Sequence, residues 1–190
     1  MEVTMRLMIH TLMLSVLTVF WGLARGDQTK PELDDLFNAL QQADDLVEMT
    51  ELQNQIWSHW YELPKQSEQI QPIFDQGMQA LHIGQPKVAI THFSQTVEAA
   101  PTFAEGWNRR ATAFFMVGNY QASLNDIQQT LILEPRHFGA LGGLSMIFET
   151  TRQYDQAIQT EQLLLKLIPQ NTLIKERIKQ LQAKSREAGI

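Results

Sequence analysis

A repeat of about 34 residues constrains the fold of this chain more than any single motif does. Pro101, Pro135 and Pro169 are evenly spaced at this period, and the same step relates Gly84 to Gly118. Small residues follow the same period in two further registers, at Gly77, Ala111 and Ser145, and at Ala89, Ser123 and Ala157. A fixed period of this kind indicates one supersecondary unit that is repeated and stacked, because a single unit cannot bury its own apolar face.

The pattern within each repeat predicts two antiparallel helices. The small residues allow the two helix backbones to approach closely. Gly84 and Gly118 are typical of helix ends, where the chain turns through a left-handed conformation. The prolines end the second helices, since proline cannot continue the helical hydrogen-bond ladder.

The best-defined copy, "AEGWNRRATAFFMVGNYQASLNDIQQTLILEP", resembles the tetratricopeptide repeat in its order of large, small, aromatic and proline positions. Its departures are Ser123 and Ile127, where Ala and an aromatic residue are usual. Together with "EPRHFGAL" and the predicted helices that precede the repeats, this copy makes the chain resemble small exported tetratricopeptide proteins of Gram-negative bacteria. That group has no established activity. The resemblance implies a right-handed α-solenoid that binds a protein or peptide in its concave groove.

We therefore expect an all-α protein with three repeats between two flanking elements. The array runs from 70 to its last proline at 169, and in full periods of 34 residues the repeats span 70–103, 104–137 and 138–171. Residues 27–64 are interpreted as a helical hairpin that forms a degenerate repeat, joined by a polar linker at 65–69. Residues 172–190 are expected to form a capping helix, since a terminal repeat has an apolar face without a neighbour.

Residues 1–26 have the layout of a secretory signal peptide. A polar opening with Arg6 precedes an apolar run from Leu7 to Leu23, and Ala24 and Gly26 fit a cleavage site before Asp27. This layout predicts a periplasmic or secreted protein. The alternative is an uncleaved anchor, which would make the chain a membrane-tethered assembly factor of the envelope.

The concave face is the expected binding site. Its residues, spaced by three and four along the first helix of each repeat, are Phe74, Met78, Leu81, Asn108, Thr112, Phe115, Gly139, Gly142 and Met146. Met and Phe suit an apolar peptide segment. The basic clamp that some family members use for a terminal carboxylate is not expected, since only Asn108 matches it. Two alternatives remain: the hairpin or the cap fills the groove, or "FGALGGLS" is only a seam of tight packing.

Other classes of function find little support. A net charge of −6 argues against nucleic acid, and the absence of cysteine excludes thiolate chemistry. The glycines of "GALGG" lie within a predicted helix and not after a strand, so a phosphate loop is not expected. No spacing of His, Asp or Glu predicts a metal, and the acidic residues are interpreted as solvated helix faces. We expect no enzyme activity and no cofactor.

Charge is unevenly distributed along the chain. Residues 32–62 hold eight acidic residues and no Lys or Arg, whereas residues 173–190 hold five basic and two acidic residues. Opposite charge at the two ends favours contact with a charged partner or with a second copy of the chain.

Overall fold

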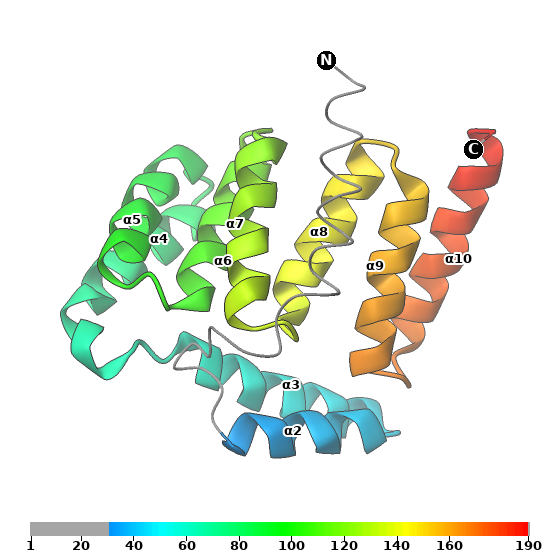
Figure 1. Cartoon of the computed structure of the whole chain (residues 1–190), viewed down its shortest axis with the longest axis horizontal. Helices are drawn as coiled ribbons and strands as arrows, with labels where there is room; N and C mark the ends of the chain where they lie inside the picture. The colour runs from blue at the N-terminus through cyan, green and yellow to red at the C-terminus, as the bar shows by residue number, and fades with distance from the viewer. Residues whose placement is uncertain (1–30, 190) are drawn as a thin grey trace.

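The computed structural model describes residues 31–189, and the regular secondary structure of this part of the chain is all helical (Figure 1). The predicted signal segment 1–26 lies outside it. The helices are α2 (Pro31–Gln42), α3 (Leu46–Tyr61), the 3-10 helix η1 (Lys65–Ile70), α4 (Gln71–His82), α5 (Pro86–Ala99), α6 (Ala104–Met116), α7 (Tyr120–Leu133), α8 (Phe138–Thr150), α9 (Tyr154–Leu167) and α10 (Thr172–Glu187). Residues 65–69, expected as a linker, form most of η1.

Three helix pairs form the body of the molecule. α4 packs with α5, α6 with α7, and α8 with α9, and each pair contacts the next (Figure 1). α10 packs against α9 and buries Leu181. The expected all-α solenoid is therefore confirmed.

The turn inside each pair has the same geometry. Gly84 and Gly118 adopt φ values of 71° and 76°, and Arg152 takes the equivalent place in the third pair with φ 59°. The residue after each of them donates its backbone N–H to a carbonyl in the last turn of the first helix, as in the bond of 2.7 Å from Gln153 to Phe148. Because a side chain makes the left-handed region costly, Arg152 carries backbone strain that the two glycines avoid.

Small residues lie where the helices of a pair approach each other. Ala89 and Ala157 are fully buried, and a Cβ on Gly77 would come within 2.6 Å of the Phe93 ring. Ser123 donates its hydroxyl to the Ala111 carbonyl over 2.8 Å, which satisfies a buried polar group. The periodic small positions of the sequence thus set the spacing between helices.

The hairpin of α2 and α3 does not extend the array beyond α4, as a degenerate repeat would. It folds back beneath the array, along the edge where α8 begins and α9 ends (Figure 1). Its apolar residues Leu33, Phe37 and Trp60 share a buried cluster with Ile168 at the end of α9. The hairpin lies here because its aromatic side chains pack against buried residues at the start of α8.

An arginine clamps the hairpin to this edge. Arg136 donates to Asp34 of α2 over 2.6 Å and to Glu134 over 3.1 Å, and its guanidinium lies 4.3 Å from the centre of the Phe37 ring. Burial opposes the charge of Arg136, but the bonds that it donates to Glu134 and Asp34, and the charges of these carboxylates, outweigh burial and raise the pKa of the guanidinium. The contacts with Asp34 and Phe37 join parts of the chain that are far apart in sequence.

Within residues 31–189, none of the helices combines the length and the apolar character needed to cross a membrane.

The strained turn at Arg152 yields a stability prediction. Arg152→Gly should raise the free energy of unfolding by about 1 kcal/mol, because glycine relieves the left-handed strain. Gly118→Arg, the matched change in the second pair, should lower it by about the same amount. Chemical denaturation of both variants measures these shifts. A destabilised Arg152→Gly variant would show that the third turn does not adopt the geometry of the other two.

Candidate functional site

A cavity opens on the concave side between α8, α9 and α10. It has a volume of about 390 Å³ and is lined by Gly142, Met146, Glu149, Thr150, Glu161, Leu164 and Arg177. Met146 is 46% exposed, and the position of a Cβ on Gly142 has no atom within 4 Å. The glycine therefore leaves open space at the surface of α8, and Met146 and Leu164 supply the apolar part of the wall.

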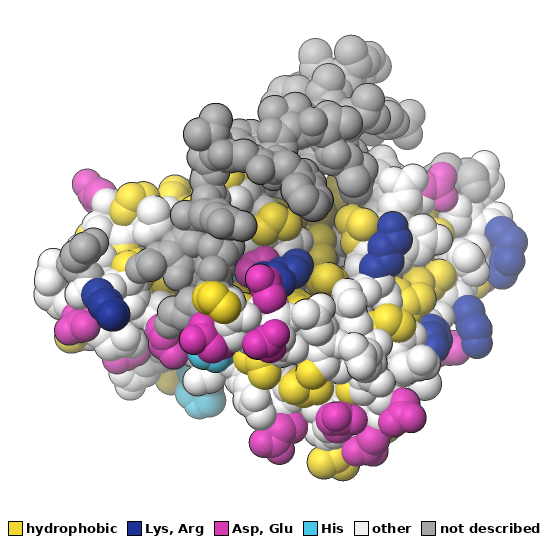
Figure 2. Space-filling view, turned by 60° about the horizontal axis from the view of Figure 1, so that its bottom comes forward, with side chains coloured by type: hydrophobic (Ala, Val, Ile, Leu, Met, Phe, Trp, Pro, Cys, Tyr) yellow, Lys and Arg dark blue, Asp and Glu magenta, His cyan; other side chains and the backbone are white. Residues whose placement is uncertain are grey.

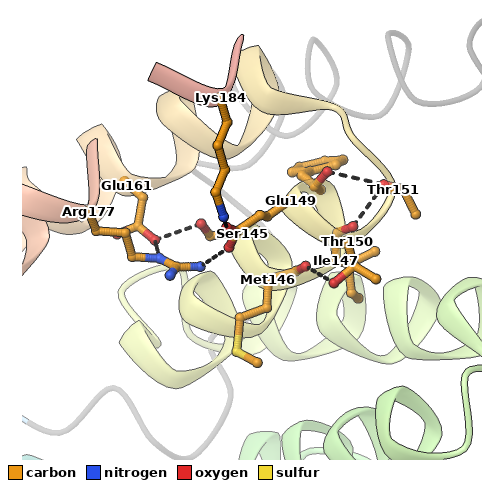
Figure 3. Close-up of polar contacts among 10 residues, drawn as sticks. Ser145, Met146, Ile147, Glu149, Thr150, Thr151, Glu161, Arg177 and Lys184 are labelled. Carbon is orange, nitrogen blue, oxygen red and sulfur yellow. Dashed lines mark hydrogen bonds and ion pairs between the residues drawn. The ribbon is translucent and has the colours of Figure 1, made fainter. Parts of the chain in front are cut away.

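Four charged side chains form one ionic cluster at this cavity (Figure 3). Arg177 of α10 donates to Glu161 of α9 and to Glu149 of α8, each over 2.6 Å. Lys184 donates to the second oxygen of Glu149, also over 2.6 Å. The hydrogen bond from Lys184 is the largest influence and lowers the pKa of Glu149; burial opposes it, and the charges of Arg177 and Lys184 lower the pKa further.

The cluster neutralises its own charges. Two cations meet two carboxylates, and the Ser145 hydroxyl donates to Glu161 over 2.6 Å. A ligand carboxylate would therefore compete with Glu149 for Arg177 and Lys184. The cavity consequently favours a neutral, apolar side chain above Gly142 and Met146.

The hairpin covers the other end of the groove. A Cβ on Gly139 would come within 2.6 Å of the Trp57 ring, so this glycine admits the tryptophan. Arg109 of α6 donates to the Tyr61 hydroxyl and lies 5.3 Å from the centre of the Trp57 ring. Burial and then the charge of Glu105 raise the pKa of Tyr61, and Arg109 partly opposes them.

A buried polar network lies beneath this contact. Glu105 is fully buried and accepts bonds from Arg109, from Asn108 over 2.9 Å and from His137 Nε2 over 3.0 Å. The backbone N–H of Ala140 donates to His137 Nδ1 over 3.1 Å, so Nδ1 is the acceptor and Nε2 carries the proton. His137 thus caps the start of α8 and joins it to α6.

The structure divides the nine expected groove residues into two sets. Gly142 and Met146 line the cavity, Thr112 is exposed, and Met78, Leu81 and Phe115 are half-buried. Phe74 is buried against Phe93 and Phe103, Asn108 is held by Glu105, and Gly139 is covered by Trp57. The last three residues face the chain's own side chains, so they do not offer a free surface.

The sequence analysis missed the ionic wall of the cavity. Glu161 occupies the register of Phe93 and Ile127, which are core positions, and a charged residue there is a sign of a buried partner. Arg177 and Lys184 are two helical turns apart, on one face of α10, and both reach Glu149. This spacing was visible in the sequence, but the partner on α8 was not.

The expectation that acidic side chains form solvated helix faces is wrong for four of them. Glu105, Asp126, Glu134 and Glu161 are at most 3% exposed. Each pairs with an arginine, as Asp126 does with Arg110 through two bonds of 2.7 and 2.8 Å. Paired charges can be buried because the partner supplies the interactions that water would otherwise provide.

Comparison with known proteins identifies a relative of similar length. A TPR (tetratricopeptide) repeat-containing protein of Rhizobium etli is 30% identical over 155 residues, which cover 82% of this chain and 75% of the relative. No model of a protein family matches the chain.

Solved structures with the same fold are more distant in sequence. The Arabidopsis OM64 TPR domain is 21% identical with a TM-score of 0.57, covering 60% of this chain and 95% of that one. The first TPR of Spaghetti (RPAP3), solved bound to the HSP90 peptide SRMEEVD, is 16% identical with a TM-score of 0.58. The match covers 62% of this chain and 95% of that one. MamA is 16% identical with a TM-score of 0.52, and the match covers 81% of this chain and 92% of that one.

The repeat period, the paired helices and the relative from Rhizobium etli agree, and the chain belongs to the tetratricopeptide-repeat protein family.

Proposed function

We propose that this chain is an exported, non-catalytic scaffold that binds a protein or peptide in the open part of its concave groove. The observation that carries the proposal is the free space above Gly142, beside the exposed Met146 and the cavity between α8, α9 and α10. A helix interior disfavours glycine by up to about 1 kcal/mol relative to alanine, so an open glycine there suits a ligand that approaches the backbone.

The chemistry of the groove favours an apolar segment as the ligand. Met146 and Leu164 supply soft and branched apolar surface, and methionine adapts to partners of irregular shape. Met78, Leu81, Thr112 and Phe115 continue the proposed surface along the neighbouring first helices. The peptide complex of the RPAP3 domain supports a peptide ligand by analogy of fold.

A role without catalysis is favoured by the burial of the acid–base pair near the groove. His137 and Glu105 are both fully buried, and each has its hydrogen bonds occupied within the protein. A substrate would have to displace Trp57 or Trp60 to reach either group. The His137–Glu105 pair therefore suits a structural role, in which it holds α8 against α6 and against the hairpin.

The sequence of residues 1–26 is the only support for the proposal that the protein is exported. Sequencing the amino terminus of the protein isolated from its host should give Asp27, with the protein in the soluble envelope fraction. A chain that begins at Met1 or Met5 and stays in the membrane fraction would contradict cleavage. It would instead support the alternative, an envelope assembly factor tethered by the apolar segment that ends at Leu23.

Two glycines of α8 distinguish the covered part of the groove from the open part. Gly142→Ala should stabilise the fold by about 0.4–1 kcal/mol, because the unfolded chain loses freedom and no neighbour is displaced. Gly139→Ala should destabilise it by about 1–3 kcal/mol, because the Trp57 ring must move within its aromatic cluster.

The two substitutions have the same chemistry in the same helix, so each is the control for the other. Urea denaturation gives both shifts. Destabilisation by Gly142→Ala would contradict the open groove. Stabilisation by Gly139→Ala would contradict the covering of the groove by the hairpin.

Filling the open space should abolish partner binding without unfolding the protein. Affinity-tagged protein, isolated from its native host, should bring down a specific protein, and Gly142→Phe should lose it. Gln129→Phe, on an exposed position of α7 away from the cavity, is the matched control and should retain it. Circular dichroism checks that both variants are folded. Equal recovery with Gly142→Phe, or no specific protein with the unaltered chain, would contradict the proposal.

A further inference from the structure

Two neighbouring apolar side chains at the start of α3 are left in solvent by the fold. Leu46 and Val47 are 61% and 73% exposed, and no other adjacent pair of large apolar residues in the described part of the chain is as exposed. Val47 precedes the fully buried Ile56 by nine residues, which is about two and a half helical turns, so the two side chains lie on opposite faces of α3. The core therefore leaves most of the apolar area of Val47 unburied.

The exposed face of α3 is hollowed beside this pair. A shallow cavity of about 350 Å³ is lined by Leu46, Val47, Thr50, Glu51 and Asn54, all from α3. The Thr50 hydroxyl donates to the Leu46 carbonyl over 2.7 Å, so it is satisfied within its own helix. Exposure of single apolar residues is ordinary, but an adjacent pair beside a hollow with a polar rim is typical of an interaction surface.

The carboxylates around this face have no cation. Asp44, Glu48 and Glu51 are exposed, and their side chains form no hydrogen bond or ion pair with the residues that the structure describes. The buried acids of the array differ, because each of them pairs with an arginine. Lys166 approaches the hairpin, since its carbonyl accepts a bond of 3.4 Å from Gln41, but its ammonium group pairs with no described carboxylate.

The surface of the hairpin carries one sign of charge. In Figure 2, acidic side chains gather over the hairpin at the bottom, with apolar side chains beside them and no Lys or Arg among them. Residues 32–62 contain eight acidic residues and no Lys or Arg. We call the surface formed by Asp44, Leu46, Val47, Glu48 and Glu51 the acidic patch.

We propose that the acidic patch is a docking surface for a partner protein that presents a basic amphipathic segment, in which Lys or Arg side chains flank apolar ones. The cations of this segment meet the unpaired carboxylates, and its apolar side chains cover Leu46 and Val47. Opposite charge steers the encounter and selects the partner, and burial of apolar area stabilises the complex. The same carboxylates repel an anionic lipid surface or a nucleic acid.

The acidic patch is separate from the open groove. Gly142 lies on α8 and faces the cavity between α8, α9 and α10, whereas the patch and its hollow lie on α3. Occupation of one surface leaves the other open. A scaffold with two such surfaces can hold two different partners, and failure of one proposal leaves the other standing.

Calorimetric titration with a defined peptide tests the docking surface. The probe is a synthetic helical peptide in which leucines form one stripe and lysines flank it, and it should bind the purified protein at a single site. Raising the salt from about 50 to about 500 mM should weaken binding by about tenfold or more, because the charges are exposed and screened. A peptide with glutamate in place of every lysine should not bind. A peptide of the same composition with its leucines scattered should bind several-fold more weakly, because it cannot cover the apolar pair.

Substitutions on α3 place the peptide on the acidic patch. Glu48→Lys with Glu51→Lys should weaken binding by about tenfold or more, because like charges then face each other. Glu98→Lys, which reverses an exposed charge on α5, is the matched control and should bind normally. Val47→Ser should weaken binding at low and at high salt, whereas Val88→Ser, at an exposed position of α5, should not. Circular dichroism checks that the variants are folded.

The remaining results distinguish this surface from the groove and from self-association. Gly142→Phe should leave binding of the lysine peptide unchanged. Loss of binding in Gly142→Phe, with none in the Glu48 and Glu51 double variant, would place the peptide in the groove and overturn this proposal alone. Sedimentation equilibrium should give a monomer, and a dimer that the double variant abolishes would show that a second copy is the occupant. No binding at low salt, or equal binding of the glutamate peptide, would also overturn the proposal.

Discussion

The packing of two tryptophans of α3 against the start of α8 determines how the rest of this molecule is arranged. Trp60 stacks on His137 with ring centres 4.1 Å apart, and Trp57 meets the edge of the same ring at 5.5 Å. Aromatic contacts of this kind are worth about 0.5–1.5 kcal/mol each beyond the area that they bury. His137 in turn holds Glu105 and the N–H of Ala140, so one contact fixes the hairpin, α6 and α8 together.

The hairpin contact decides which part of the groove is available. Trp57 and Tyr61 occupy the end of the concave face near the starts of α6 and α8, where a peptide would otherwise reach Asn108 and Gly139. The space beside α9 and α10 stays open, with Arg177 and Lys184 held by Glu149 and Glu161 at its wall. Glu161 is buried and accepts bonds from both Arg177 and Ser145, so this part of the wall is expected to keep its shape when a ligand binds. The chain thus combines a closed half and an open half in one short solenoid.

The repeat made the fold predictable, and the exceptions have physical causes. The period places Gly84, Gly118, Ala89 and Ala157 in the registers where the structure has turns and close helix contacts. The position of the hairpin was not predictable. The sequence pattern shows that α2 and α3 each have one apolar face, but it does not show which surface of the array these faces contact. The site was predictable only in part: Gly142 and Met146 line the cavity, whereas Gly139 is covered by Trp57, which comes from a distant part of the chain. Two of the buried acids, Asp126 and Glu161, were missed because their arginine partners come from other helices.

The central claim is that the hairpin covers Gly139 and leaves Gly142 open. Nuclear Overhauser contacts in the free protein measure this directly. We expect contacts between the ring protons of Trp57 and the α protons of Gly139, since a Cβ there would lie 2.6 Å from the ring. The α protons of Gly142 should show contacts only within α8. Contacts between Trp57 and Gly142, or a Trp57 ring without contact to α8, would contradict the account.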